Sequence, residues 1–174
     1  LPSRQYNQIV RDFPGERVQG WQGRTIISLF RKQAAKTPEN RAVVFKGESL
    51  TYAQLDEITN RLAARLIELG AGRGSVVGVM VSRGMMMPIG ALSALKAGAA
   101  YLPMDPSYPA DRLQYMLSDA GVNILLCDPN LADRVPDFSG VFVDTETVDQ
   151  LPAAAPVPDI SRPEDLFILL YTSG

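Results

Sequence analysis

The sequence contains no histidine and a single cysteine, Cys127, among its 174 residues. Without histidine the chain cannot by itself form a Ser-His-Asp or Cys-His catalytic group, and it offers no imidazole ligand to a metal ion. One cysteine excludes an internal disulfide bond and a zinc site built from several cysteines. Most hydrolase and metalloenzyme mechanisms are therefore excluded, unless the missing groups come from elsewhere.

The chain also lacks a strong charge of either sign and a long apolar run. Its 17 lysines and arginines nearly balance 19 aspartates and glutamates, which gives no general electrostatic reason to bind nucleic acid or an anionic membrane. The apolar stretch at residues 84–95 is shorter than the ~20 residues that cross a bilayer. No signal peptide is recognisable, and an unpaired cysteine fits a reducing compartment, so we expect a cytoplasmic protein.

What is present is the pattern of one globular domain, since the chain is 46% hydrophobic and long enough to bury a core. Apolar residues recur at three- and four-residue steps in several segments that begin or end at recognisable caps. In the clearest of them, Thr51 and Gln54 have the spacing of a capping box. The pattern predicts helices at residues 25–36, 51–69, 85–97 and 110–120.

Short apolar runs lie between these helices. They predict strands at residues 42–45, 75–81, 100–104, 123–127, 141–143 and 166–171. Strands that alternate with helices of ten or more residues indicate an α/β fold of layered βαβ units around a largely parallel sheet. The proline-rich stretch at residues 151–163 is expected to be an exposed loop.

The end of the chain is the best candidate for a binding site. In open α/β sheets, ligands bind at the carboxyl ends of the strands, and Thr172, Ser173 and Gly174 directly follow the last predicted strand. Their hydroxyl and N–H groups could hold a phosphate, although an ordinary turn has the same composition. The chain contains neither a G-x-G-x-x-G nor a G-x-x-x-x-G-K-[ST] motif, so the Rossmann and Walker types of nucleotide site lack support.

Three segments together resemble the first three core motifs of nonribosomal peptide synthetase adenylation domains. They are LTYAQL at residues 50–55, LKAGAAYLPMD at 95–105 and LYTSG at 170–174. The flanking PSYPADRL at residues 106–113 is similar to that family rather than to acyl-CoA synthetases or luciferases. The resemblance extends from about residue 24 to the last residue.

The resemblance implies the N-terminal subdomain of an adenylate-forming enzyme fold. Such an enzyme joins ATP, with Mg2+, to a carboxylic substrate that is usually an amino acid, and releases pyrophosphate. It then passes the acyl group to the phosphopantetheine thiol of a carrier protein. Thr172, Ser173 and Gly174 match the start of the loop that binds the ATP phosphates. No catalytic residue and no metal ligand is assigned.

The family's third motif continues beyond the residue that matches Gly174. We therefore expect residues 24–174 to be the N-terminal part of an adenylation domain, truncated at its phosphate-binding loop and inactive without the remainder of the domain. Residues 1–23 resemble the linker from an upstream condensation domain. Two alternatives stay open: a non-catalytic scaffold or interaction subdomain, and a ligase similar to acyl-CoA synthetases.

Several other residues are expected to have structural roles. Lys96 is interpreted as a side chain that extends from a helix end to solvent, where a cation complements the helix dipole. Tyr52 is interpreted as a half-buried anchor, Asp105 as a turn residue, Cys127 as inert, and Arg83 as solvated. Met85, Met86 and Met87 are expected to fill the core or an interface.

Overall fold

A computed structural model describes residues 23–172 of the chain. The predicted linker, Gly23 apart, lies outside these residues, as do two predicted phosphate-binding residues, Ser173 and Gly174. Thr172 is the last residue that the structure describes. Within the described part, no helix is long and apolar enough to cross a membrane.

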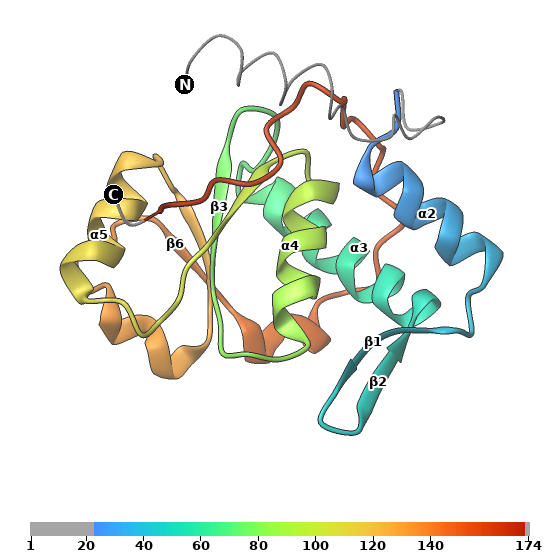
Figure 1. Cartoon of the computed structure of the whole chain (residues 1–174), viewed down its shortest axis with the longest axis horizontal. Helices are drawn as coiled ribbons and strands as arrows, with labels where there is room; N and C mark the ends of the chain where they lie inside the picture. The colour runs from blue at the N-terminus through green and yellow to red at the C-terminus, as the bar shows by residue number, and fades with distance from the viewer. Residues whose placement is uncertain (1–22, 173–174) are drawn as a thin grey trace, which may run out of the picture.

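A four-stranded parallel sheet forms the centre of the molecule. Its strands are β3 (Val76–Met80), β4 (Ala100–Pro103), β5 (Ile124–Cys127) and β6 (Val141–Asp144), in the spatial order β4-β3-β5-β6. The predicted α/β class with a parallel sheet is confirmed. A separate antiparallel hairpin of β1 (Arg41–Phe45) and β2 (Glu48–Thr51) projects from one end of the molecule (Figure 1). The second strand of this hairpin was not predicted, because it is short and half polar.

The helices occupy the predicted positions. They are α2 (Ile26–Lys36), α3 (Tyr52–Glu68), α4 (Met86–Lys96) and α5 (Ala110–Asp119). Two short 3₁₀ helices, η2 (Pro129–Arg134) and η3 (Thr145–Gln150), were not predicted. The capping box predicted at the start of α3 is present: the hydroxyl of Thr51 accepts from the N–H of Gln54, whose side chain accepts from the N–H of Thr51. An equivalent box between Thr25 and Ser28 begins α2.

Helices cover both faces of the sheet, with α5 on one side and α3 and α4 on the other (Figure 1). Successive strand residues point to opposite faces, so each strand contributes to both cores. In β5, Ile124 and Leu126 pack with α3 and α4, whereas Leu125 and Cys127 pack with α5. Burial on both faces explains why these strands are continuously apolar rather than alternating.

A glycine of α4 brings this helix close to the sheet. A Cβ atom at Gly90 would lie 2.6 Å from Cδ2 of Leu126 and 3.0 Å from Cγ1 of Val79. Both neighbours are side chains of the central strands β3 and β5. Gly90 therefore sets the separation between α4 and the sheet.

The interpretation of Lys96 as a solvent-directed side chain is wrong. Lys96 is only 2% exposed, and its ammonium group lies against the polar side of α3. It donates to Oδ1 of Asp56 at 2.7 Å, to the hydroxyl of Thr59 at 2.7 Å and to Oδ1 of Asn60 at 2.8 Å. Burial can be tolerated because each donated bond has a polar acceptor.

The proline-rich stretch and the segment after it form one extended connection across the molecule. The stretch runs over the surface, as predicted, but arginines attach it to the helical part: Arg31 donates to the carbonyl of Val157 at 2.5 Å, and Arg73 to that of Ile160 at 2.6 Å. The strand predicted at residues 166–171 is reduced to one parallel bridge, between Ile168 and Tyr101 of β4.

Candidate functional site

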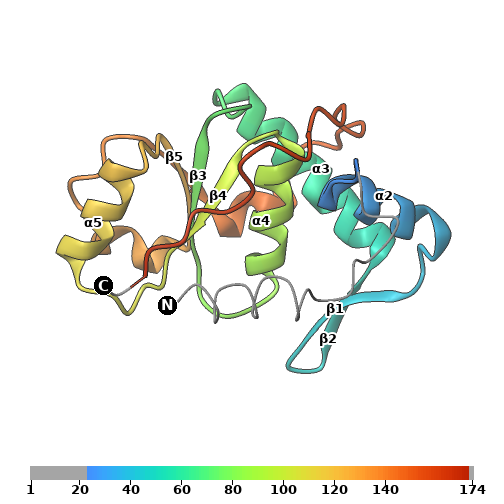
Figure 2. The ribbon, with the colours of Figure 1, turned by 45° about the horizontal axis from the view of Figure 1, so that its top comes forward.

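The loops that follow the parallel strands meet at one edge of the sheet. Because Ile168 pairs with Tyr101 in the parallel sense, the segment after it runs toward the same edge. Figure 2 shows this segment passing beside β4 and ending near α5. Thr172, at its end, is exposed. Thr172 is the one predicted phosphate-binding residue that the structure describes. It therefore lies at the carboxyl edge of the sheet, where α/β proteins bind ligands.

A cleft of about 540 Å³ opens at this edge. Its walls come from the end of β3, the first turns of α4, the segment from β4 to the following loop, and the final segment. The lining is chiefly apolar and includes Val81, Met87, Ala91, Tyr101, Pro103, Met104, Tyr108, Met116, Leu170 and Tyr171. Arg83 and Asp105 are the charged residues in this lining.

Hydrogen bonds fix the loops around the cleft. Asp128, which follows β5, accepts from the N–H of Ser82 at 2.7 Å and from the hydroxyl of Thr145 at 2.7 Å, so one carboxylate ties together the loops after β3, β5 and β6. Asp105 accepts from the N–H of Ser107 at 2.9 Å. The backbone and hydroxyl groups of Ser107 lower the pKa of Asp105, with a smaller contribution from Arg83. The predicted turn role of Asp105 is confirmed.

Two arginines hold Tyr108 at the rim of the cleft. The guanidinium carbon of Arg112 lies 4.2 Å from the centre of the Tyr108 ring, within the range of a cation–π contact. Arg134 donates to the carbonyl oxygen of Tyr108 at 2.9 Å. Tyr108 is therefore joined to α5 through its ring and to η2 through its backbone carbonyl.

The three methionines at the start of α4 have different surroundings. Met85 and Met86 are partly buried and pack against the core shared by α3 and α4. Met87 is 46% exposed and lines the cleft. An adaptable thioether side chain at the mouth of a cleft suits contact with a ligand or with another part of a protein.

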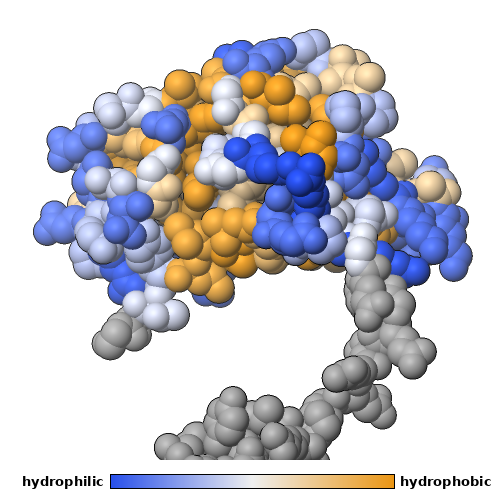
Figure 3. Space-filling view, turned by 90° about the horizontal axis from the view of Figure 1, so that it is seen from above, coloured by the Kyte–Doolittle hydropathy of each residue, from blue (hydrophilic) through white to orange (hydrophobic). Residues whose placement is uncertain are grey.

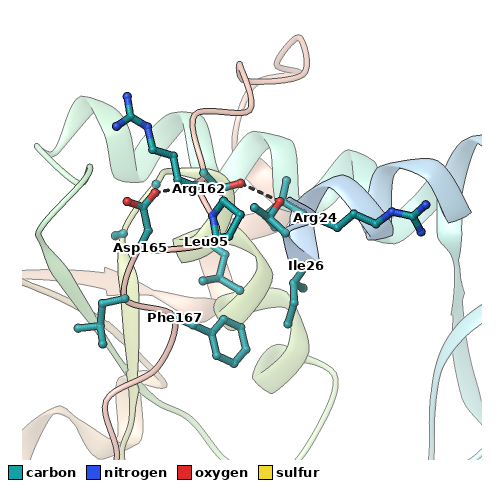
Figure 4. Close-up of a pocket in the computed structure, with 13 residues that line it drawn as sticks. Arg24, Ile26, Leu95, Arg162, Asp165 and Phe167 are labelled. Carbon is teal, nitrogen blue, oxygen red and sulfur yellow. Dashed lines mark hydrogen bonds between the residues drawn. The ribbon is translucent and has the colours of Figure 1, made fainter. Parts of the chain in front are cut away.

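A second, smaller cavity of about 180 Å³ lies at the opposite edge of the sheet, where β4 begins. Figure 4 shows Ile26, Leu95 and Phe167 converging on it from α2, α4 and the final segment. The hydroxyl of Ser161 lies 3.0 Å from that of Thr25, and the N–H of Arg162 donates to Asp165 at 2.8 Å. This cavity is a gap between α2, α4 and the final segment where they pack together, and it lies far from the loops that follow the strands.

The residues that line the cleft were not assigned to a site from the sequence. Arg83 is exposed, as expected, yet it also lines the cleft beside the loop that holds Asp105. Tyr108 and Tyr171 were not assigned roles, although each lies within a motif that carries the family resemblance. The signal in the sequence that could have identified Tyr171 as part of the site is its position directly before the hydroxyl-rich turn.

The described residues do not form a metal site on their own: within residues 23–172 there is no group of three or more His, Cys, Asp or Glu side chains that could hold an ion. Among the described residues that line the cleft, Asp105 is the only acidic one, and its carboxylate already accepts from Ser107. We therefore assign no magnesium ligand.

Comparison with known proteins agrees with this arrangement. The sequence pattern of the AMP-binding enzymes matches residues 30–174. The chain is 42% identical over 156 residues to tyrocidine synthase 2 of Brevibacillus parabrevis, covering 86% of this chain and 4% of that protein. It is 36% identical over 174 residues to gramicidin S synthase 2 of Brevibacillus brevis, covering 100% of this chain and again 4% of the relative.

A solved structure of the nonribosomal peptide synthetase FmoA3, in a form bound to α-methyl-L-serine-AMP, superposes with a TM-score of 0.83 at 30% identity. The match covers 97% of this chain and 19% of FmoA3. The resemblance to peptide synthetases is therefore confirmed, and the chain spans a small part of the length of these relatives. The chain belongs to the family of AMP-binding enzymes.

Proposed function

We propose that this chain contributes the first part of an amino-acid-activating domain of a peptide synthetase. The observation that carries the proposal is the course of the final segment, which runs parallel to β4 and ends with exposed Thr172 at the carboxyl edge of the sheet. Thr172, Ser173 and Gly174 would begin the loop that binds the phosphates of ATP. The peptide synthetases among its relatives, and FmoA3 with its bound α-methyl-L-serine-AMP, support the same activity.

The proposed reaction needs no histidine. An amino acid carboxylate, ionised at neutral pH, attacks the α-phosphorus of ATP, and the bond to pyrophosphate breaks to leave an aminoacyl adenylate. Because the nucleophile is already an anion, the protein has to position the reactants and neutralise charge on the phosphates rather than remove a proton. A threonine hydroxyl and the N–H groups of a glycine-bearing turn can donate hydrogen bonds to phosphate oxygens.

An exposed apolar surface supports the proposal that residues 24–174 act with further polypeptide. Leu166, Phe167 and Leu170 are 57%, 39% and 64% exposed along the final segment, and Ile26 nearby is 47% exposed. Figure 3 shows apolar side chains gathered across the middle of this face. Contiguous apolar patches of this kind mark surfaces that another part of a protein covers. The remainder of an adenylation domain is the occupant that we propose.

The same proposal extends to the partners. The adenylate would be transferred to the phosphopantetheine thiol of a peptidyl carrier protein, Mg2+ would accompany ATP, and residues 1–23 would connect to an upstream condensation domain. We propose the cytoplasm as the location.

The test is amino-acid-dependent exchange of labelled pyrophosphate into ATP, measured on the synthetase that contains this chain. We expect exchange with one or a few amino acids and none with fatty or aryl acids. The substitution Thr172→Ala should raise the KM for ATP about tenfold, because it removes one hydrogen bond to a charged group, and Thr172→Ser should restore most of the loss.

Thr147→Ala is the matched control, because Thr147 is an exposed threonine of η3 on the side of the sheet away from β4. It should leave the KM for ATP unchanged. Exchange with fatty acids but not amino acids would instead support a ligase similar to acyl-CoA synthetases. Exchange with no acid at all would support a non-catalytic subdomain, and either result would overturn the proposal.

A further inference from the structure

The side chain of Tyr171 is attached to α5 immediately before the predicted phosphate-binding residues. Its hydroxyl donates to Oδ2 of Asp119 at 2.5 Å. The ring packs edge-to-face against Tyr115, with ring centres 6.1 Å apart and planes at 83°. The hydroxyl of Tyr115 also donates to Oδ1 of Asp119, at 3.4 Å. One carboxylate thus accepts from a tyrosine on α5 and from a tyrosine on the final segment.

Asp119 is in an unfavourable place for the helix itself. It is the last residue of α5, and the last turn contains no basic residue. A carboxylate at a helix C-terminus lies near the negative end of the helix dipole, which is mildly destabilising. The helix dipole therefore gives no reason for an acid at this position, whereas the short bond from Tyr171 does. A hydrogen bond to an ionised acceptor is also stronger than a neutral one.

The hydrogen bond from Tyr171 to Asp119 lies just beyond the point where the backbone bonds between the final segment and β4 end. The N–H of Tyr101 donates to the carbonyl of Phe167 at 3.2 Å, and the N–H of Leu169 donates to the carbonyl of Tyr101 at 3.0 Å. Within the described residues, no further backbone bond joins the segment to β4 after Leu169. The side chain of Tyr171 is consequently the last fixed point of the chain before Thr172.

The chemistry of Tyr171 fits a permanent donor. Partial burial, together with the hydrogen bond and charge of Asp119, raises the pKa of Tyr171 to about 12. The hydroxyl therefore keeps its proton at neutral pH and can donate to Asp119 at all times. Asp119 itself is exposed, so the pair lies at the surface and not in the core.

We propose that Asp119 and Tyr171 form a positioning pair that fixes the start of the phosphate-binding residues to α5. The proposal rests on the proposed function, because it gives the pair a role in binding ATP. Neither residue contacts the reacting atoms. Each acts by holding Thr172 at one position relative to the cleft.

The test uses the synthetase that contains this chain, with the substitutions Tyr171→Phe and Asp119→Ala. We expect each to raise the KM for ATP about five- to tenfold, with kcat and the KM for the amino acid changed less than twofold. The double variant should be no worse than either single variant, because both remove the same bond. Asp119→Asn keeps a carbonyl acceptor and should restore part of the loss. Asp133→Asn, at an exposed acid of η2, is the control and should change nothing.

A second measurement does not depend on activity. Amide hydrogen exchange at Leu169, whose N–H donates to the carbonyl of Tyr101, should become several-fold faster in Tyr171→Phe and Asp119→Ala, while exchange within α5 stays the same. Unchanged exchange and an unchanged KM for ATP would overturn the positioning pair. If the synthetase shows no pyrophosphate exchange, the proposed function fails, and the amide exchange still decides whether the pair fixes the segment.

Discussion

The ammonium nitrogen of Lys96 lies 2.7 Å from Oδ1 of Asp56, although the two residues are on different helices and 40 positions apart in the sequence. Lys96 is at the end of α4, and Asp56 is in the first turns of α3. The same ammonium group lies 5.2 Å from the centre of the Phe30 ring on α2. One buried cation therefore links α2, α3 and α4 on one side of the sheet.

Removing this cation should be strongly destabilising. Lys96→Ala leaves Asp56, Thr59 and Asn60 without their donor and opens a cavity beside Phe30, so we expect the free energy of unfolding to fall by about 3 kcal/mol. Asp56→Asn should cost less, since the ammonium group keeps the other acceptors. Urea unfolding followed by circular dichroism measures both.

Lys36→Ala is the control for this experiment, because Lys36 is an exposed lysine in the last turn of α2. Its effect should be within about 0.5 kcal/mol of zero. Equal stabilities of Lys96→Ala and Lys36→Ala would show that the buried network contributes nothing.

The Lys96 network shows what sequence reasoning could not reach. The position of a lysine near a helix end, before Gly98, indicated a solvated side chain, and the sequence contains no local sign of a partner 40 residues away. Polar residues on an amphipathic helix usually face water, so the sequence offers no reason to place Asp56 and Asn60 against a buried lysine. Contacts between distant helices depend on how the helices pack, and periodicity carries no information about that.

Local signals were more dependable. The capping spacing of Thr51 and Gln54 predicted the start of α3 correctly, since both hydrogen bonds lie within one turn of chain. The strand predicted from Leu166 to Tyr171 was wrong in extent, because apolar composition cannot tell whether a neighbouring strand completes the ladder. The position of Thr172 at the carboxyl edge followed correctly from the expectation of a parallel sheet.

The capping box of α3 gives a second stability prediction. Thr51→Ala removes the acceptor for the N–H of Gln54, and substitutions of this kind cost about 1 kcal/mol. Thr51→Ser keeps the hydroxyl and should retain most of the stability. Thermal unfolding measures the difference, and a Thr51→Ala variant as stable as Thr51→Ser would show that the box does not matter.

The close approach of α4 to the sheet predicts an unusual cost for alanine in a helix. Gly90→Ala places a methyl group against Leu126 and Val79, and overpacking of this kind costs about 1–3 kcal/mol. The gain of about 1 kcal/mol in helix propensity offsets only part of this cost. We expect a net loss of stability of about 1 kcal/mol. Gly72→Ala, where the added atom meets nothing within 4 Å, should be neutral or slightly stabilising.

The buried thiol of Cys127 predicts slow alkylation of the folded chain. Cys127 is 2% exposed at the end of β5, and its Sγ donates to the carbonyl of Asp128 at 3.2 Å. Burial, with smaller contributions from the charges of Asp128 and Asp144, raises the pKa of this thiol to about 11. Since the thiolate is the reactive form, the rate with iodoacetamide at pH 8 should be about a hundredfold lower than that of a thiol of ordinary pKa. Mass spectrometry of timed samples measures the rate, and unfolding in urea should restore it.

The same raised pKa fixes the sign of a pH effect on stability. The unfolded thiol ionises at lower pH than the folded one, so the unfolded state loses its proton first as pH rises. The contribution of Cys127 is therefore complete below pH 9 and is lost between pH 9 and about 11. Tyr171 also ionises at high pH, so the measured quantity is the difference in unfolding free energy between the natural chain and Cys127→Ala. That difference should fall across this window, and a difference that stays constant would mean that the folded thiol ionises as easily as the unfolded one.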